Sequence, residues 1–487
     1  MSDDVEQTQR GRGSARRVLA ALLGLGLVAL CVGWWLRFQP AELLSASGRP
    51  NVVMISIDTL RADHLSLYGY SRETSPRIDA LARRGVTFDN AFAHSPKTAV
   101  SHMSLFTGLT PEAHGVRQWA KVSSRRLSDD IPTLASLLQD AGYYTAAITS
   151  GGHMRAELGF DDGMQFFQVV PDLRRAFRRA RDVLTERAGG GDRLAPFFLF
   201  VHTYEVHAPY TPIAPYDSLF TSRDYQGGIV SSQRDLVKAA AGDWGRQHEI
   251  FWQAVDETSE ADLQHLQDLY DGSIRFVDDQ IGEFLDWLSG AGVLDQTLVI
   301  VLSDHGEEFL DHGRFQHNQA YEELLRVPLV MAFPGPPGES GRGVREGGLV
   351  RLVDVAPTVL DFLGVPLPDH VEGVSLLPLL AGGAGPPEVV ISGWPEPGIR
   401  SLRRDDWKLI ERRSSAGKWV RLYDLQEDPA EQLDLAESEP GRRDALRQHL
   451  RAMEMASRAF RDARERGRAV EPDEEAIEHL RALGYIE

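Results

Sequence analysis

The stretch Asn51–Asp58, NVVMISID, is a short apolar run that ends in a carboxylate. Pro50 precedes it, and its β-branched and other apolar residues occupy both odd and even positions. Neither face of a strand built from this run would therefore be polar, which is typical of a parallel sheet covered on both sides. The run predicts a fully buried strand with Asp58 at its carboxyl end.

Strand and helix patterns alternate downstream of this run. Helical periodicity covers residues 74–86, 130–143 and 266–292, and strand-like runs cover residues 144–150, 196–204 and 297–306. This order predicts an α/β fold: a doubly wound, mixed or parallel sheet flanked by helices on both faces. Ligands in such folds bind beyond the carboxyl ends of the strands.

Three of the predicted strands end in groups capable of chemistry: Asp58, His202 and the pair Asp304-His305. A carboxylate oxygen and an imidazole nitrogen from the pair can hold one cation, with Asp58 as a third ligand. The alternative is that Asp304 caps a helix and His305 packs in the core. His312 and His317 follow closely in the same segment and favour a site.

A second candidate segment is HSPKTAVSHMSLFTG, residues 94–108. It contains two hydroxyls, Thr98 and Ser101, and His102 just before an apolar run. A hydroxyl next to a cation loses its proton more readily and becomes a nucleophile. The alternative reading makes Thr98 only the N-cap of the helix that follows, and the two roles can coexist.

The composition excludes some functions. The 487 residues contain 52 Lys and Arg against 71 Asp and Glu, a formal charge of −19. Such a balance argues against nucleic-acid binding, which needs clustered cations. With only Cys31, the chain can form no intramolecular disulfide.

Residues 18–36, VLAALLGLGLVALCVGWWL, are free of charge and follow several arginines. At helical rise this run covers about 28 Å, close to the hydrocarbon thickness of a bilayer. The arginines predict a cytoplasmic N-terminus and an extracytoplasmic remainder, periplasmic or extracellular. A cleaved signal peptide is the alternative, but no small-residue cleavage site follows.

The domain organisation follows from these patterns. Two insertions interrupt it: a basic amphipathic segment, 172–193, and a polar, poorly periodic one, 216–260. We expect a cytoplasmic basic tail at 1–17, a transmembrane anchor at 18–37, a linker at 38–49, a catalytic domain at 50–385, a small C-terminal α+β subdomain at 386–437 and a charged helical tail at 438–487.

An ordered series of motifs resembles the sulfatase family of the alkaline-phosphatase superfamily. The matching blocks include NVVMISIDTLRADHLSLYGY, SLFTGLTPEAHGV, IPTLASLLQDAGYYTA, SDHGEEFLDHG, YEELLRVPLV and LYDLQEDPAEQLDLA, and together they span residues 50–437. The resemblance implies an alkaline-phosphatase-like fold and one divalent cation. Calcium is favoured by the family, and Mg²⁺, Mn²⁺ and Zn²⁺ are compatible with these ligand types.

The resemblance also implies roles for individual residues. It assigns catalysis to Thr98, His102, His207 and His317, substrate binding to Ser101, His114, His202 and His312, and the metal to Asp58, Thr98, Asp304 and His305. Sulfatases carry an oxidisable Cys or Ser where this chain has Thr98, so no formylglycine is expected. Three further family residues are missing: Thr59 replaces a second Asp, TSGGHM lacks a sulfate-binding lysine, and His317 stands at another lysine position.

These observations predict a membrane-anchored, metal-dependent hydrolase of sulfate or phosphate esters, with a glycan, a lipid or a small molecule as the substrate. Two alternatives remain. One is a transferase of phosphoryl-containing headgroups, similar to phosphoethanolamine transferases, which the threonine and the anchor allow. The other is a non-catalytic binding protein on a sulfatase scaffold, which the missing cysteine and lysine allow.

Overall fold

The computed structural model describes residues 48–118, 124–188, 196–241, 244–335, 343–383, 385–386, 389–394, 398–414, 417–464, 469–470 and 473–483. The predicted tail, membrane anchor and most of the linker fall on residues 1–47, outside this part. Within the described ranges, no helix is both long enough and apolar enough to cross a membrane.

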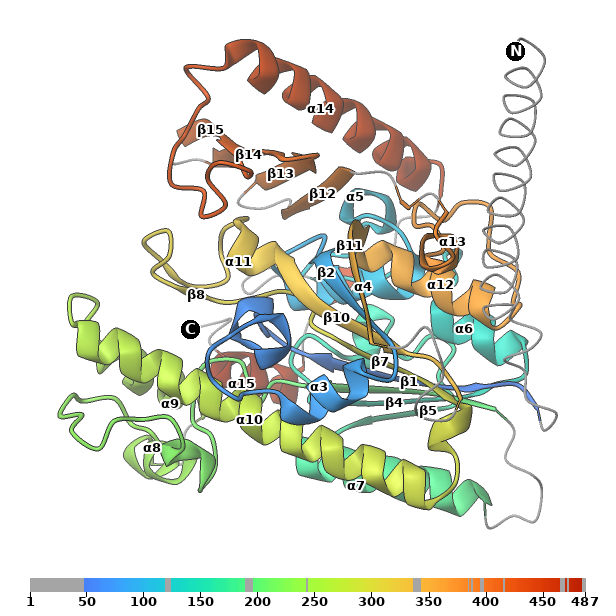
Figure 1. The fold of residues 1–487 in the computed structure, drawn as a ribbon, viewed down its shortest axis with the longest axis horizontal. Coiled ribbons are helices and arrows are strands. Elements are labelled where there is room, and N and C mark those ends of the chain that lie inside the picture. Colours follow the sequence, from blue (N-terminus) through green and yellow to red (C-terminus); the bar gives the residue numbers. More distant parts are fainter. Residues whose placement is uncertain are drawn as a thin grey trace, which may run out of the picture.

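An eight-stranded mixed sheet forms the centre of the large domain (Figure 1). Its order is β11 (Val344–Arg351), β2 (Val86–Phe92), β10 (Arg326–Ala332), β7 (Thr297–Leu302), β1 (Asn51–Ile57), β6 (Phe197–Thr203), β4 (Tyr144–Thr149) and β5 (Phe166–Val169). β10 runs antiparallel to β2 and β7, and the other pairings are parallel. β1 lies between β6 and β7, so the carboxyl ends of these three strands meet.

Helices cover both faces of this sheet, as predicted (Figure 1). One layer contains α4 (Thr98–Thr107), α5 (Pro111–His114), α6 (Leu134–Asp140) and α12 (Val355–Phe362), and the other contains α3 (Pro76–Ala82), α7 (Leu173–Ala188) and α10 (Glu260–Gly290). Val52 and Met54 of β1 pack into the first core, whereas Val53, Ile55 and Ile57 pack into the second. The mostly apolar run therefore forms a strand that is buried on both sides.

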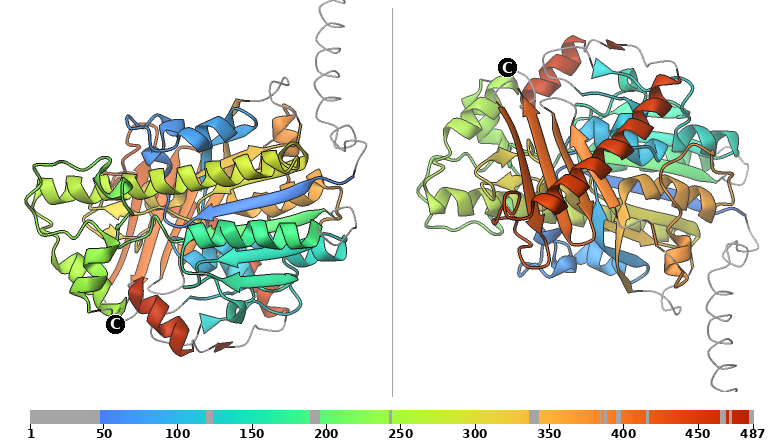
Figure 2. Two further views of the ribbon diagram at one scale, coloured as in Figure 1. Left: turned by 90° about the horizontal axis from the view of Figure 1, so that it is seen from below. Right: turned by 90° about the horizontal axis from the view of Figure 1, so that it is seen from above.

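The C-terminal subdomain is a four-stranded antiparallel sheet covered by one long helix (Figure 2). Its strands are β12 (Val389–Trp394), β13 (Ile399–Arg404), β14 (Trp407–Ser414) and β15 (Gly417–Asp424). The helix α14 (Pro440–Asp462) contributes Leu446 and Leu450 to the core of this sheet. The predicted tail at 438–487 therefore begins inside the subdomain, and the tail is not one continuous helix. It goes on to a short strand, β16 (Ala469–Val470), and a second helix, α15 (Glu474–Ala482).

The polar segment 216–260 is also more ordered than its sequence pattern predicts. It contains two helices, α8 (Gln233–Ala239) and α9 (Trp244–Gln253). Leu236 and Phe251 are fully buried in the core that also contains α10. With so few apolar anchors, these helices have no periodicity long enough to recognise in the sequence.

A buried ion pair joins the subdomain to the large domain. The ammonium group of Lys408 on β14 lies 2.9 Å from Glu322 Oε1 and 3.0 Å from Glu431 Oε1, and its side chain is 1% exposed. Glu322 begins the short helix α11 (Glu322–Leu325) of the large domain, and Glu322 also pairs with Arg403 on β13.

Replacing Lys408 by methionine should lower the free energy of unfolding by about 3–5 kcal/mol, because two buried carboxylates lose their shared cation. Denaturant unfolding would measure the loss. Lys418→Met, an exposed change on the neighbouring strand, should stay within about 0.5 kcal/mol of wild type. Equal stability of the two variants would show that the ion pair does not hold the domains together.

Candidate active site

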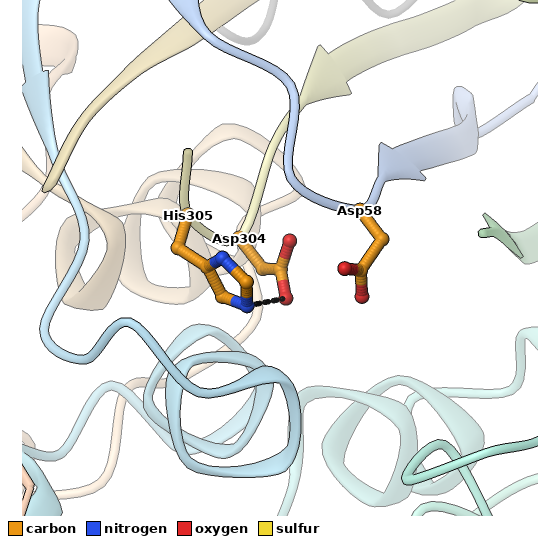
Figure 3. Close-up of side chains that lie close together, drawn as sticks. All are labelled: Asp58, Asp304 and His305. Carbon is orange, nitrogen blue, oxygen red and sulfur yellow. Dashed lines mark ion pairs between the residues drawn. The ribbon is translucent and has the colours of Figure 1, made fainter. Parts of the chain in front are cut away.

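The strand ends bring together the three predicted metal ligands (Figure 3). Asp58 follows β1, and Asp304 and His305 follow the neighbouring parallel strand β7. One ligand atom from each residue lies within 4.8 Å of the others, and all three side chains are fully buried. Figure 3 also marks the 3.4 Å contact between His305 Nε2 and Asp304 Oδ2.

The carboxylates of Asp58 and Asp304 have few hydrogen-bond donors among the residues that the structure describes. Asp58 Oδ1 and both oxygens of Asp304 accept no hydrogen bond of normal geometry from them. Burial raises the pKa of both carboxyls well above the usual range, and the neighbouring Asp58 raises the pKa of Asp304 further. Two adjacent buried carboxylates and one neutral imidazole match the donors of a divalent cation, so the residues present fit a metal.

Backbone contacts fix the orientation of His305. Its Nδ1 donates to the Gly306 carbonyl at 3.0 Å, which leaves Nε2 as the ring nitrogen without a proton. A Cβ at Gly306 would lie 1.9 Å from the Glu323 carbonyl, so only glycine permits this approach. Thr59, by contrast, donates its hydroxyl to the Asp58 carbonyl at 2.8 Å and offers no ligand to the cluster.

Thr98 is the first residue of α4, and its hydroxyl reaches the cluster. Oγ1 lies 3.5 Å from His305 Nε2, and a hydrogen bond from Thr98 lowers the pKa of Asp58. The N-cap of α4 is Lys97, not Thr98, and no side chain caps this helix start. The capping interpretation of Thr98 is therefore wrong, and its hydroxyl instead lies beside the predicted metal ligands.

Ser101 and His102 lie on the same helix and form hydrogen bonds to the backbone around the cluster. Ser101 Oγ donates to the Asp304 carbonyl at 2.7 Å. His102 Nδ1 donates to the Thr98 carbonyl at 2.8 Å, and its Nε2 lies 2.8 Å from Ser56 Oγ. Both side chains already form hydrogen bonds within the protein. We therefore interpret Ser101 and His102 as positioning residues and not as groups that contact the substrate.

Three further predicted histidines do converge on the cluster. His202 Nε2 lies 3.2 Å from Asp58 Oδ2. His207 and His317 face each other, with Nε2 atoms 3.2 Å apart, while their Nδ1 atoms face the carbonyls of Ala208 and Pro96. Where both Nδ1 atoms are donors, a hydrogen bond between the Nε2 atoms needs one additional proton, shared by the two rings. Burial lowers the pKa of both rings and so disfavours this proton in the free protein, whereas a bound anionic substrate would favour it.

Two predicted histidines lie elsewhere. His114 accepts the Val116 amide at Nδ1, and its Nε2 contacts Ser104 Oγ at 3.2 Å. His312 pairs with Glu323 at 2.7 Å and stacks on Tyr321 at the contact with the C-terminal subdomain. Both assignments to substrate binding are corrected: these side chains are engaged in local packing and ion pairing.

Sequence reasoning missed Lys97, the residue directly before Thr98. It is 5% exposed, and its ammonium group lies 2.9 Å from Asn318 Oδ1 and 3.5 Å from His317 Nδ1. Burial lowers its pKa to about 7, against the opposing effect of Glu307, Glu308 and Asp58. Its position in HSPKTAV, next to the candidate nucleophile, was the available signal for a cation in the site.

Two buried carboxylates and a histidine at adjacent strand ends of an α/β sheet define a candidate metal-dependent active site. The family model "Sulfatase" matches residues 50–365, and "N-sulphoglucosamine sulphohydrolase, C-terminal" matches residues 310–456. The chain belongs to the sulfatase family, whose members hydrolyse sulfuric esters.

Named relatives and solved structures agree with this membership. An arylsulfatase of Clostridium perfringens is 26% identical over 80% of this chain and 91% of its own length. An N-acetylglucosamine-6-O-sulfatase of Bacteroides thetaiotaomicron is 25% identical over 79% of this chain and 82% of its own. A structure solved with its substrate D-glucosamine-2-N,6-O-disulfate has a TM-score of 0.69 at 22% identity, and it covers 84% of this chain and 98% of its own. The phosphonate monoester hydrolase of Agrobacterium radiobacter has a TM-score of 0.65 at 23% identity, over 84% and 96%.

Proposed function

We propose that this chain is a metal-dependent hydrolase of sulfate or phosphate esters in which Thr98 is the nucleophile. One observation carries the proposal: the Thr98 hydroxyl contacts Asp58 and lies 3.5 Å from His305, beside the orphaned oxygens of Asp304. A hydroxyl in this position would be next to a cation held by the three predicted ligands.

The residues suggest a two-step displacement. A divalent cation held by Asp58, Asp304 and His305 would favour the ionised form of the Thr98 hydroxyl. Thr98 Oγ then forms a bond to sulfur or phosphorus, the bond to the leaving oxygen breaks, and that oxygen takes the proton shared by His207 and His317. In the second step water displaces Thr98 Oγ, and the proton of that water returns to the histidine pair.

Lys97 and His202 support the same chemistry. The protonated form of Lys97 would add positive charge beside His317. His202 holds the Asp58 carboxylate from the other side at 3.2 Å. Lys97 and His202 thus affect the charge around the reacting groups and their orientation. These two factors supply most of the rate enhancement in transfers of this type.

A substrate panel tests the proposed reaction. The full chain, reconstituted in turn with Ca²⁺, Mg²⁺, Mn²⁺ and Zn²⁺, would be assayed on an aryl sulfate, a phosphate monoester, a phosphate diester and an aryl phosphonate. Glucosamine 6-sulfate should be included because the named relatives act on sulfated sugars. Turnover of one ester class that depends on added metal supports the proposal, and release of a headgroup only to an added alcohol would favour the transferase.

We also propose that the catalytic domain is anchored to a membrane and lies outside the cytoplasm, because of the uncharged run at 18–36. Full-length protein should sediment with membranes and resist extraction by carbonate. Protease added to the outer face should release a fragment that begins near residue 40. Recovery of a soluble mature protein, cleaved after the apolar run, would contradict the anchor.

A further inference from the structure

A second cluster of potential metal ligands lies outside the active site, where the large domain meets the C-terminal subdomain. Glu308 begins the short strand β8 (Glu308–Phe309), which pairs with β9 (Phe315–Gln316). His312 lies in the turn between these strands, and Glu323 is on the neighbouring helix α11 (Figure 1). One ligand atom from each of the three side chains lies within 4.8 Å of the others.

The three side chains of this cluster are buried, unlike those of an ordinary acidic patch on a surface. Glu308 is fully buried, and the side chains of His312 and Glu323 are 8% and 9% exposed. The Gln319 amide donates to Glu308 Oε1 at 2.6 Å, whereas Oε2 accepts no hydrogen bond from the part of the chain that the structure describes. A buried carboxylate oxygen without a donor is costly, so it calls for a proton or a cation.

The contacts of His312 fix which of its ring nitrogens can bind a cation. Nε2 lies 3.2 Å from the Glu431 carbonyl, which can only accept, so this nitrogen carries a proton. The Gln432 amide is further from Nε2, at 3.4 Å, and already donates to the Ala430 carbonyl at 2.9 Å. Nδ1 lies 2.7 Å from Glu323 Oε1. Nδ1 therefore either carries a second proton or offers its lone pair to a cation shared with Glu323.

The cluster needs positive charge from outside its own residues. Burial, together with the charges of Glu323 and Asp311, raises the pKa of Glu308 to about 9. The cations nearby already have carboxylate partners: Arg61 pairs with Asp311 at 3.0 Å, and Lys408 pairs with two other glutamates. A divalent cation would compensate both carboxylates of the cluster at once.

We propose that Glu308, His312 and Glu323 bind a second divalent cation of the Zn²⁺ type, separate from the ion of the active site. Carboxylate oxygens and an imidazole nitrogen are ligands that Zn²⁺ accepts, whereas Ca²⁺ and Mg²⁺ prefer oxygen ligands alone. The hydrogen bond from Nε2 to the Glu431 carbonyl is the kind of outer contact that orients a metal-binding imidazole. The ion would link the β8–β9 segment to α11 next to the C-terminal subdomain. This structural role does not depend on the proposed reaction.

Counting bound zinc in full-length variants tests the second site. Metal-depleted protein would be dialysed against Zn²⁺ alone, and bound zinc would be measured by mass spectrometry. One equivalent should be kept by Asp304→Asn, which changes only the active-site cluster, and lost by Glu308→Gln. Glu323→Gln changes a ligand on a different element and should lose the same equivalent. Glu427→Gln, an exposed change in the subdomain, should bind zinc like wild type.

Thermal unfolding gives a readout that needs neither turnover nor the active-site ion. In Asp304→Asn, Zn²⁺ at about 100 times its Kd should raise the melting temperature by at least about 3 °C, because the ion binds only the folded protein. The double variant Asp304→Asn/Glu308→Gln should show no such rise. The inference is overturned if wild type binds no zinc, if Asp304→Asn alone removes all of it, or if Glu308→Gln and Glu323→Gln both keep the wild-type amount. In the second case the ligands proposed for the active site would still stand.

Discussion

Replacing Thr98 by alanine is expected to lower turnover at least about 10³-fold, because no other hydroxyl at the metal cluster can replace the nucleophile. Ser101, the nearest hydroxyl along the helix, already donates to the Asp304 carbonyl. Stability should change by less than about 1 kcal/mol, since Lys97 and not Thr98 is the N-cap of α4. Parallel measurement of kcat and melting temperature separates loss of chemistry from loss of fold.

Two companion variants sharpen this experiment. Thr98→Ser keeps a hydroxyl at the same position and should retain measurable activity. Ser101→Ala removes one bond to the Asp304 backbone and should reduce activity only in part. A trapped phospho- or sulfo-threonine at position 98 would identify the attacking atom directly. Wild-type turnover by Thr98→Ala, with metal bound, would mean that water attacks the ester.

The second large effect is expected for Asp304→Asn, which should weaken metal binding at the active-site cluster by more than about 100-fold and abolish turnover. The change removes one of two buried negative charges that face the cation, while the shape of the side chain is kept. The metal-free variant should be at least as stable as metal-free wild type, because the uncompensated repulsion between Asp58 and Asp304 is gone.

Metal content after dialysis, together with calorimetric titration, would measure this loss. Asp129→Asn is a matched control, since Asp129 is exposed and lies 3.8 Å from Arg126. This control should bind metal like wild type. Treatment of wild type with a chelator should reproduce the activity of Asp304→Asn, and readdition of metal should restore only wild type. Full metal occupancy in Asp304→Asn would refute the ligand set.

The sequence predicted those parts of the site that follow from sheet topology. Asp58, His202 and the pair Asp304-His305 each end a mostly apolar run, and neighbouring parallel strands must bring their carboxyl ends together. The same reasoning predicted the mixed sheet and its two helix layers. Thr98 was found by its place in a motif, and the structure puts it at the cluster.

Other features depend on packing that no local pattern reveals. Spacing along α4 could not tell that Ser101 and His102 face the backbone of Asp304 and Thr98. His479 on α15 contacts the Gly152 amide, and this contact depends on how the chain returns after α14. His312 looked like its neighbour His317 in sequence, but it faces the C-terminal subdomain because Glu323 holds it there.

The central place of β1 has a consequence for how the protein is made. Its first residue pairs with Thr297, which is 246 positions later in the chain. At about 5–20 residues per second, synthesis takes roughly 12 to 50 s to cover this interval. During that time the apolar run NVVMISI has no partner on one side, and a β-branched run without charge readily associates with other chains. Folding of the large domain therefore depends on keeping this run from associating with other chains until β7 has been synthesised.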